Sequence, residues 1–216
     1  NGLNKISNER IFAELEKILA LKNLYKLFIN DSSREIIQNI FPQFKYYERL
    51  KIINKLNKKT RDKYDKKLIL ALLIIDESNN YEYFCHKYKT SNETKDRFKN
   101  ISINFENLKN KKFFTEQKIR KLIYLSNKIY VRDLLLFSIC KTKKADILNI
   151  EKLIDYVDSC KIPKFPITGN HLKKYGYEDG KILGKELKFL EEKWIENNFI
   201  LEKKLFEKYI KKNKKN

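Results

Sequence analysis

The sequence predicts an all-α protein, an irregular multi-helix array followed by a small helical tail. The 216 residues include only 5 Gly and 3 Pro. All-β folds need more turn residues than this, and doubly wound α/β folds need Gly-rich turns between strands and helices. Apolar residues also recur at helical spacing along most of the chain. Together these observations favour long helices.

The first helices are expected in the following order. Ser7 is a natural N-cap, and Glu9 in the first turn suits the positive end of the helix dipole. A second cap is expected at residues 31–33, and Pro42 is expected to start a further element. Residues 61–76 are expected to form one helix, because their second half is apolar nearly all round.

The remaining body helices are expected to begin at Ser91, at Thr115 and at Asp146, with a strongly apolar helical segment over 131–140. We place the main boundary near Cys160. Three of the five glycines and two of the three prolines fall between 163 and 180, so the composition changes there. A short helix ending at Tyr175, a long helix over 181–198 and a final helix over about 201–211 are expected to follow.

The charge of the chain predicts attraction to polyanions. Lys and Arg exceed Asp and Glu by 20, and nucleic acid is the leading candidate partner. The alternative is a compositional bias of an AT-rich genome, because Lys far outnumbers Arg. The densest basic run lies between Lys55 and Lys67, where a solvated junction between two helices is an equally simple interpretation.

Stand-alone catalysis is not expected from this sequence. Cys85, Cys140 and Cys160, with two histidines, lack the spacing of a zinc site or of a nucleophilic triad. We find no phosphate-binding loop, no Asp-x-Asp pair for magnesium and no apolar run long enough to span a membrane. The odd cysteine count favours a reducing, cytoplasmic location. Since the chain contains no Met, we expect it to be part of a longer protein.

The most informative segment runs from Pro166 to Gly184. It reads Pro-Ile-Thr-Gly-Asn-His-Leu over 166–172 and Gly-Tyr-Glu-Asp-Gly-Lys-Ile-Leu-Gly over 176–184. A glycine-bounded turn that enters a helix leaves backbone N–H groups free, and these groups can bind a phosphate. A plain helical hairpin with Gly just after a helix end remains the alternative.

These residues, with Leu187 and Trp194, resemble the C-terminal region of bacterial class II tRNA nucleotidyltransferases, a family that contains CCA-adding enzymes and bacterial poly(A) polymerases. The segment from Leu3 to Leu19 is similar to motif E of that family, which lies in the neck. Segments around Lys89 to Arg97 and Val131 to Asp133 are weakly similar to its helical body. His171 departs from the pattern, because the family usually has Asp there, which would cap or tie the short helix.

The resemblance implies three parts: the end of a neck over 1–30, a helical body over 31–160 and a helical tail over 161–216. Glu9, Arg10 and Glu14 would brace the neck. The catalytic head, with its Gly-Ser and Asp-x-Asp motifs, is absent from this chain and would precede it in cis or be a separate chain. We therefore assign no catalytic residue, no metal site and no cofactor here, while the complete enzyme would use magnesium, CTP and ATP.

The implied partner is the acceptor arm of tRNA, which the body and tail would hold through phosphates, with no membrane involved. Two other functions remain open: part of a bacterial poly(A) polymerase, and a non-catalytic helical RNA-binding or scaffold protein. The residues expected to face RNA are Lys173, Lys174, Gly180, Lys181, Gly184 and Lys185 in the tail, with Lys89, Lys95 and Arg97 as a second patch.

Overall fold

The computed structural model describes residues 6–109, 114–143 and 146–213, and every regular element in these ranges is helical. The predicted all-α class is therefore confirmed. The α-helices are α1 (Asn8–Leu19), α2 (Tyr25–Ile29), α3 (Asp31–Ile40), α4 (Leu50–Ile53), α5 (Lys58–Arg61), α6 (Lys66–Ile74), α7 (Asn80–Lys87), α8 (Asn92–Ile103), α9 (Glu116–Leu125), α10 (Lys128–Ile139), α11 (Ile147–Ser159), α12 (Gly169–Lys173), α13 (Lys181–Glu196) and α14 (Lys203–Asn213). Leu3, part of the motif E similarity, lies outside the described residues.

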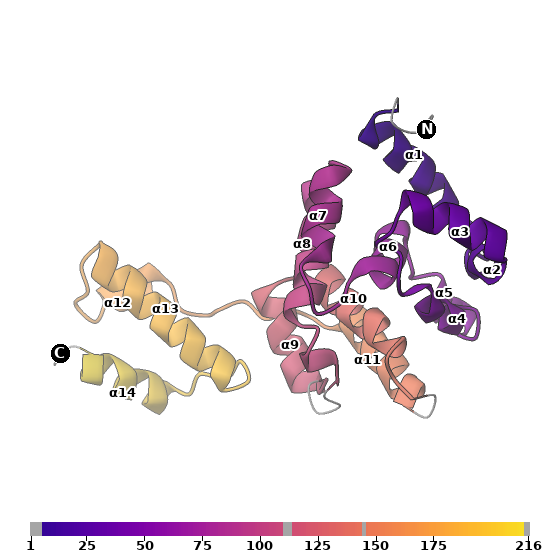
Figure 1. The fold of residues 1–216 in the computed structure, drawn as a ribbon. Helices are drawn as coiled ribbons and strands as arrows, with labels where there is room; N and C mark the ends of the chain where they lie inside the picture. The colour runs from indigo at the N-terminus through magenta and orange to yellow at the C-terminus, as the bar shows by residue number, and fades with distance from the viewer. Residues whose placement is uncertain (1–5, 110–113, 144–145, 214–216) are drawn as a thin grey trace.

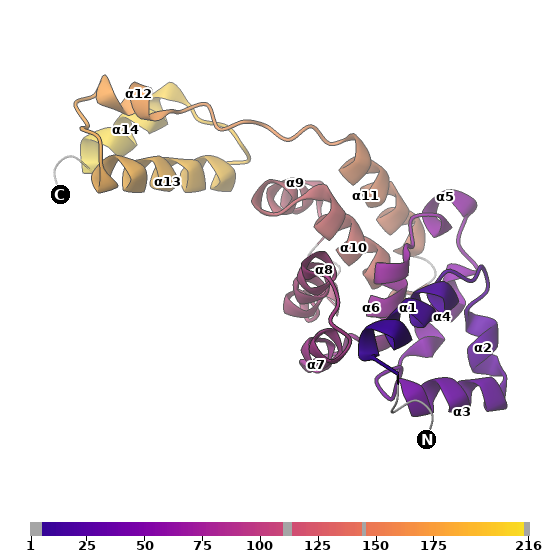
Figure 2. The same ribbon diagram turned by 90° about the horizontal axis from the view of Figure 1, so that it is seen from above.

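The helices form two groups that an extended segment connects. Helices α1–α11 pack together, while α12, α13 and α14 form a separate layer on the side of α9 (Figures 1 and 2). Residues 160–168 between the groups have no regular secondary structure. From here on we call the first group the body, which includes the expected neck end as well as the expected body, and the second group the tail. Among the described residues, no helix combines the length and apolar character needed to cross a bilayer.

Each group has its own hydrophobic core. In the body, α6 and α10 are buried nearly all round and are surrounded by the amphipathic helices. In the tail, Leu172 of α12 and Leu190 of α13 are fully buried and pack with Phe206 and Ile210 of α14. Because burial of apolar area is the main favourable term in folding, the two cores give body and tail separate sources of stability.

Side-chain caps explain where most helices begin. Ser7, Ser91 and Thr115 accept hydrogen bonds from backbone N–H groups in the first turns of α1, α8 and α9, as predicted. The cap of α3 is Asn30, one residue before the expected position, and its Oδ1 accepts from the Ser33 N–H at 2.9 Å. The starts of α7 and α2 carry no such cap and were not expected.

The expected single helix over 61–76 is wrong. Helix α5 ends at Arg61, and α6 begins only at Lys66. Asp65 separates them, because its backbone is extended and its Oδ1 accepts from the Leu68 N–H at 2.8 Å. An Asp side chain that caps a new helix competes successfully with continuation of the old one.

Contacts between aromatic rings connect the tail to the body. The ring of Tyr124, on α9, lies 5.4 Å from the Trp194 ring on α13 and 5.5 Å from the Phe199 ring. The Tyr124 hydroxyl also donates to the Glu191 carboxylate, and burial, followed by this bond, raises the pKa of Tyr124 to about 12. Lys121 Nζ donates to the Glu196 carbonyl at 3.0 Å. The end of α13 is thereby held against α9.

Candidate nucleic-acid interface

The turn that opens α12 keeps its cap despite His171. The backbone N–H of Thr168 donates to His171 Nδ1 at 3.1 Å, and Thr168 Oγ1 lies 2.9 Å from the same nitrogen. This is the reciprocal arrangement of a capping box, in which a side chain in the first turn satisfies the N-cap N–H. The imidazole therefore fills the capping role that the resemblance assigns to Asp.

Gly180 and Gly184 are both exposed to solvent in the tail. Gly180 has φ 139°, a backbone conformation that side chains rarely adopt, so the turn itself requires glycine there. Gly184 lies inside α13, and a Cβ built on it would meet nothing within 4 Å. Glycine inside a helix costs about 1 kcal/mol relative to alanine. Neither packing nor backbone conformation in the described part of the tail explains that cost.

The start of α13 presents free backbone donors. Its N-cap, Gly180, offers no side chain, and the N–H groups of residues 181–183 have no acceptor among the described residues. The helix has 16 residues, and the side chain of Ile182 is 75% exposed. Unpaired N–H groups and the helix dipole together favour an anion at this end.

Four lysines lie within seven residues of Gly180 in the sequence. Lys174, Lys181 and Lys185 are exposed, and none forms an ion pair with a residue in the described ranges. Lys173 differs, because its Nζ lies 2.7 Å from Asp179 Oδ2. The Asp179 carboxylate also precedes Gly180 directly. The positive charge of the turn therefore comes from the other three lysines, which with the α13 start we call the tail patch.

The second patch does not form as expected. Lys95 is exposed on α8, but Lys89 is paired with Glu9. Arg97 is only 5% exposed, and its guanidinium binds Asp133 and Asp65 at distances of 2.6–3.1 Å. The expectation that Arg97 faces RNA is wrong, because this group connects α8, α10 and the α6 cap inside the body.

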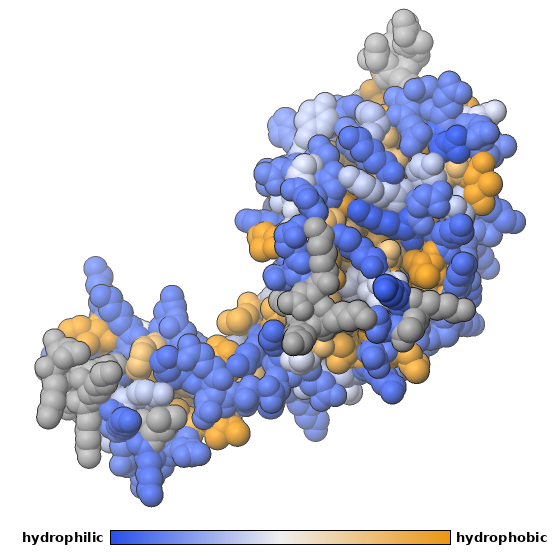
Figure 3. All heavy atoms as spheres, turned by 60° about the horizontal axis from the view of Figure 1, so that its bottom comes forward, coloured by the Kyte–Doolittle hydropathy of each residue, from blue (hydrophilic) through white to orange (hydrophobic). Residues whose placement is uncertain are grey.

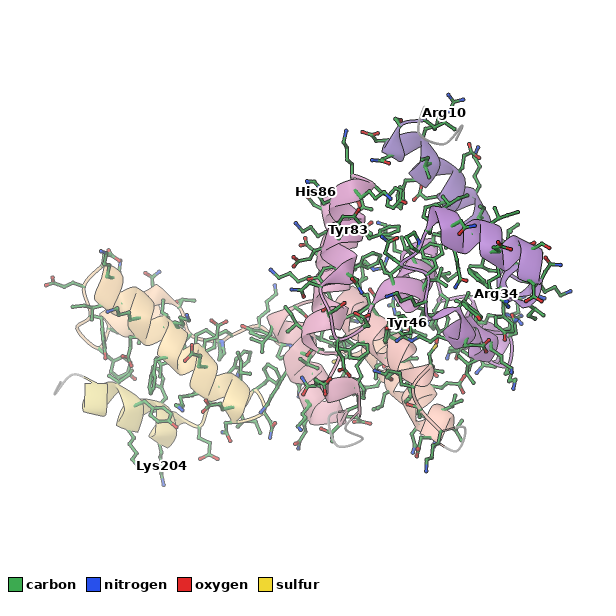
Figure 4. All side chains as sticks on the ribbon, in the orientation of Figure 1. Arg10, Arg34, Tyr46, Tyr83, His86 and Lys204 are labelled. Carbon is green, nitrogen blue, oxygen red and sulfur yellow. The ribbon has the colours of Figure 1, made fainter. Side chains whose placement is uncertain are left out.

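The motif E-like residues lie on the outer side of α1. Glu9 pairs with Lys89 in the turn between α7 and α8, and this bond lowers the pKa of Glu9. Glu14 pairs with Lys17 at 2.8 Å on the same helix. Arg10 extends into solvent at the outer end of α1 (Figure 4). The Glu9–Lys89 pair thus connects α1 to the turn between α7 and α8. The expectation that Glu9, Arg10 and Glu14 brace a neck stays a prediction.

The basic run between Lys55 and Lys67 has two faces. Lys59, Lys63 and Lys67 pair with Asp155, Asp158 and Glu93, respectively. Lys58, Arg61 and Lys66 point to a different side, where they line a cavity together with Lys22. The four-residue spacing of the paired lysines was visible in the sequence, but their acidic partners are 26 or more residues away, which sequence reasoning missed.

Two of the cysteines are poor nucleophiles. Burial raises the pKa of Cys85, and it raises the pKa of Cys140 to about 12, so both thiols are protonated at neutral pH. Within the described ranges, no three His, Cys, Asp or Glu residues are grouped so that they could hold a metal. Hydrophilic side chains cover most of the face drawn in Figure 3, and apolar groups are scattered over it.

Comparison with known proteins bears on the N-terminal part of this chain. Residues 1–48 match the family model described as "Probable RNA and SrmB- binding site of polymerase A". No curated protein matches the chain. The matched residues comprise α1, α2, α3 and the loop that follows, so this segment resembles an RNA-binding region of the poly(A) polymerase family, with RNA as the partner.

Proposed function

We propose that this chain is the RNA-holding part of a class II tRNA nucleotidyltransferase, which adds CMP and AMP to tRNA 3′ ends. The body and tail grip the acceptor arm through its phosphates and fix the distance from this grip to the active site. Such positioning accelerates a reaction by proximity. The observation that carries the proposal is the match of residues 1–48 to an RNA-binding family.

The tail patch supports holding through phosphates. Its free helix donors and exposed lysines suit a polyanion, and Gly180 and Gly184 leave room for a backbone to approach. It lies at the opposite end of the molecule from α1 (Figure 1), so only an elongated RNA, such as an acceptor arm, could touch both regions at once.

We place the chemistry in a separate catalytic head, in cis or as a partner chain. In this proposal the head also binds magnesium, CTP and ATP, because magnesium prefers carboxylate oxygens and the Asp-x-Asp motif of the head would supply them. This chain alone is then expected to bind tRNA and to transfer no nucleotide. The location we expect is the cytoplasm, where tRNA is processed.

Poly(A) polymerase is the second candidate, since the description of the matched family names polymerase A. The full protein, assayed on tRNAs that end before C, CC or CCA, separates the two activities. A CCA-adding enzyme stops after completing CCA, whereas a poly(A) polymerase extends with A on any of them. If a protein containing this chain and a head extends none of them, a non-catalytic helical RNA-binding or scaffold protein is the remaining alternative.

A further inference from the structure

A cavity on the body combines an apolar floor with a cationic rim. It has a volume of about 640 Å³, within the range of sites that bind small molecules. The helices α1, α4, α5 and α6 that form it lie together on the side of the body away from the tail (Figure 2). It is thus a different site from the tail patch.

The floor is hydrophobic, and part of it is accessible. Leu19 and Tyr64 are buried, Ile53 and Ile69 are half-buried, and Leu21 is 50% exposed. The buried hydroxyl of Tyr64 donates to the Leu136 carbonyl at 2.7 Å. Its polar atom is therefore satisfied within the body, which leaves the floor suited to a flat apolar group.

The rim carries unpaired positive charge. Lys22, Lys58, Arg61 and Lys66 line the cavity with exposed side chains, and the structure records no ion pair between them and any residue it describes. Two acids also line it, but Asp65 is occupied by the Arg97 guanidinium, which leaves Asp62. The neighbouring Lys59, Lys63 and Lys67 are neutralised by carboxylates, so unpaired charge is concentrated on the cavity side.

We propose that this cavity binds one nucleotide unit of single-stranded RNA, with the base over the apolar floor and the flanking phosphates on the cationic rim. A free phosphate would leave the floor unused, and a duplex keeps the faces of its bases stacked and inaccessible. Residues 19–22 of the lining also belong to the segment that matches an RNA-binding family. This inference adds a second contact on the body and does not depend on the tail patch.

The test is a fluorescence titration of the 216-residue chain with a four-nucleotide RNA that carries 2-aminopurine. Lys58→Gln with Arg61→Gln removes two rim charges. We expect Kd to rise about tenfold and the salt slope of binding to fall by about 1.4, since each phosphate contact on a single strand contributes about 0.7. The matched control, Lys99→Gln with Lys152→Gln, removes two exposed charges elsewhere and should change Kd less than twofold.

A second variant tests the floor without changing charge. Ala20 is exposed at the end of α1 and lines the cavity, so Ala20→Phe fills the space where the base would lie. We expect at least a tenfold loss of affinity for the oligonucleotide. Unchanged binding by Ala20→Phe, equal effects of the rim variant and its control, or no binding by the parent chain would each overturn the proposal.

Two further arms identify the source of the nucleotide and separate this inference from the proposed function. AMP should bind at least tenfold more weakly than the oligonucleotide, because it brings one phosphate, and equal affinity would assign the cavity to free nucleotides instead. Lys174→Gln, Lys181→Gln and Lys185→Gln together should leave oligonucleotide binding unchanged. Loss of tRNA binding in that variant, with oligonucleotide binding retained, shows two independent sites.

Discussion

Arg97 Nε donates to Asp133 Oδ2 at 2.6 Å inside the body, where the two side chains are 6% and 4% exposed. The same guanidinium reaches Asp65 at the start of α6. Although burial alone would lower the pKa of Arg97, its hydrogen bonds to these carboxylates raise it. One charged group therefore fixes the relative positions of α8, α10 and the α6 cap.

Removal of Arg97 should destabilise the body strongly. Arg97→Met leaves Asp133 buried and unpaired, which costs about 3–5 kcal/mol, whereas Arg97→Met with Asp133→Leu removes both charges and should be less damaging. Urea unfolding followed by circular dichroism measures both variants. A loss below 1 kcal/mol for the single variant would show that the pair does not hold these helices.

Asp158 should make stability depend on pH. Burial alone would raise its pKa, but hydrogen bonds from Lys63 and Arg132 lower it below the ordinary 3.8. A carboxylate with a lowered pKa stabilises the fold above its unfolded pKa, and this stabilisation is lost as pH falls through the folded pKa. Asp158→Asn should cost about 1 kcal/mol at pH 7, given the partial exposure of the pair.

The difference between Asp158→Asn and the parent chain should shrink as the pH is lowered below about 4, the ordinary range for Asp. Urea unfolding at pH 7 and at pH 3 measures it. Asp155→Asn is a suitable control, because its partner Lys59 is 66% exposed and the pair should contribute little. A constant difference between the two pH values would contradict the assigned role of Asp158.

Gly184→Ala should stabilise the tail and weaken RNA binding at the same time. Alanine is favoured over glycine inside a helix by about 1 kcal/mol, and nothing lies within 4 Å of the added Cβ. Trp194, the only tryptophan, reports tail unfolding by fluorescence. If the variant is more stable and binds tRNA as well as the parent chain does, Gly184 is not a point of RNA approach.

Tyr124→Ala should release the tail from α9. The variant removes the ring that contacts both Trp194 and Phe199, as well as the bond to Glu191. We expect a larger radius of gyration by small-angle X-ray scattering, with both cores still folded. Tyr124→Phe keeps the ring contacts and should change the radius much less. An unchanged radius for Tyr124→Ala would mean that other contacts hold the tail.

Local features of the fold were predictable from the sequence, while long-range ones were not. Helical periodicity and the caps at Ser7, Ser91 and Thr115 are encoded within a few residues, so their prediction was confirmed. The burial of Arg97 depends on partners 32 and 36 residues away, which periodicity does not encode. Asp65 is an exception among the local features, because its capping bond to Leu68 is local and Asp is a common N-cap, but the apolar run that follows it made it look like part of one helix.

For the candidate sites, too, features formed by neighbouring residues were predictable from the sequence, and features formed by distant residues were not. The glycine-bounded turn around Gly180 was readable because its residues are adjacent in the sequence. The cavity was not, since it brings together residues 19–22 and 58–66 and depends on which lysines are paired elsewhere. The placement of the tail depends on Tyr124 and Glu191, which are 67 residues apart.

The most direct test of RNA holding is a salt titration of tRNA binding by this chain and two charge-matched variants. Lys174→Gln, Lys181→Gln and Lys185→Gln together remove the tail patch lysines. Lys203→Gln, Lys204→Gln and Lys208→Gln together remove three exposed lysines of α14, of which Lys204 is labelled in Figure 4. We predict that the first variant lowers the salt slope by about 2–3, since each of three phosphate contacts contributes about 0.7–0.9, and that the second changes it far less. Equal losses in both variants, or equal affinity of the parent chain for tRNA and for duplex DNA of similar charge, would contradict the account.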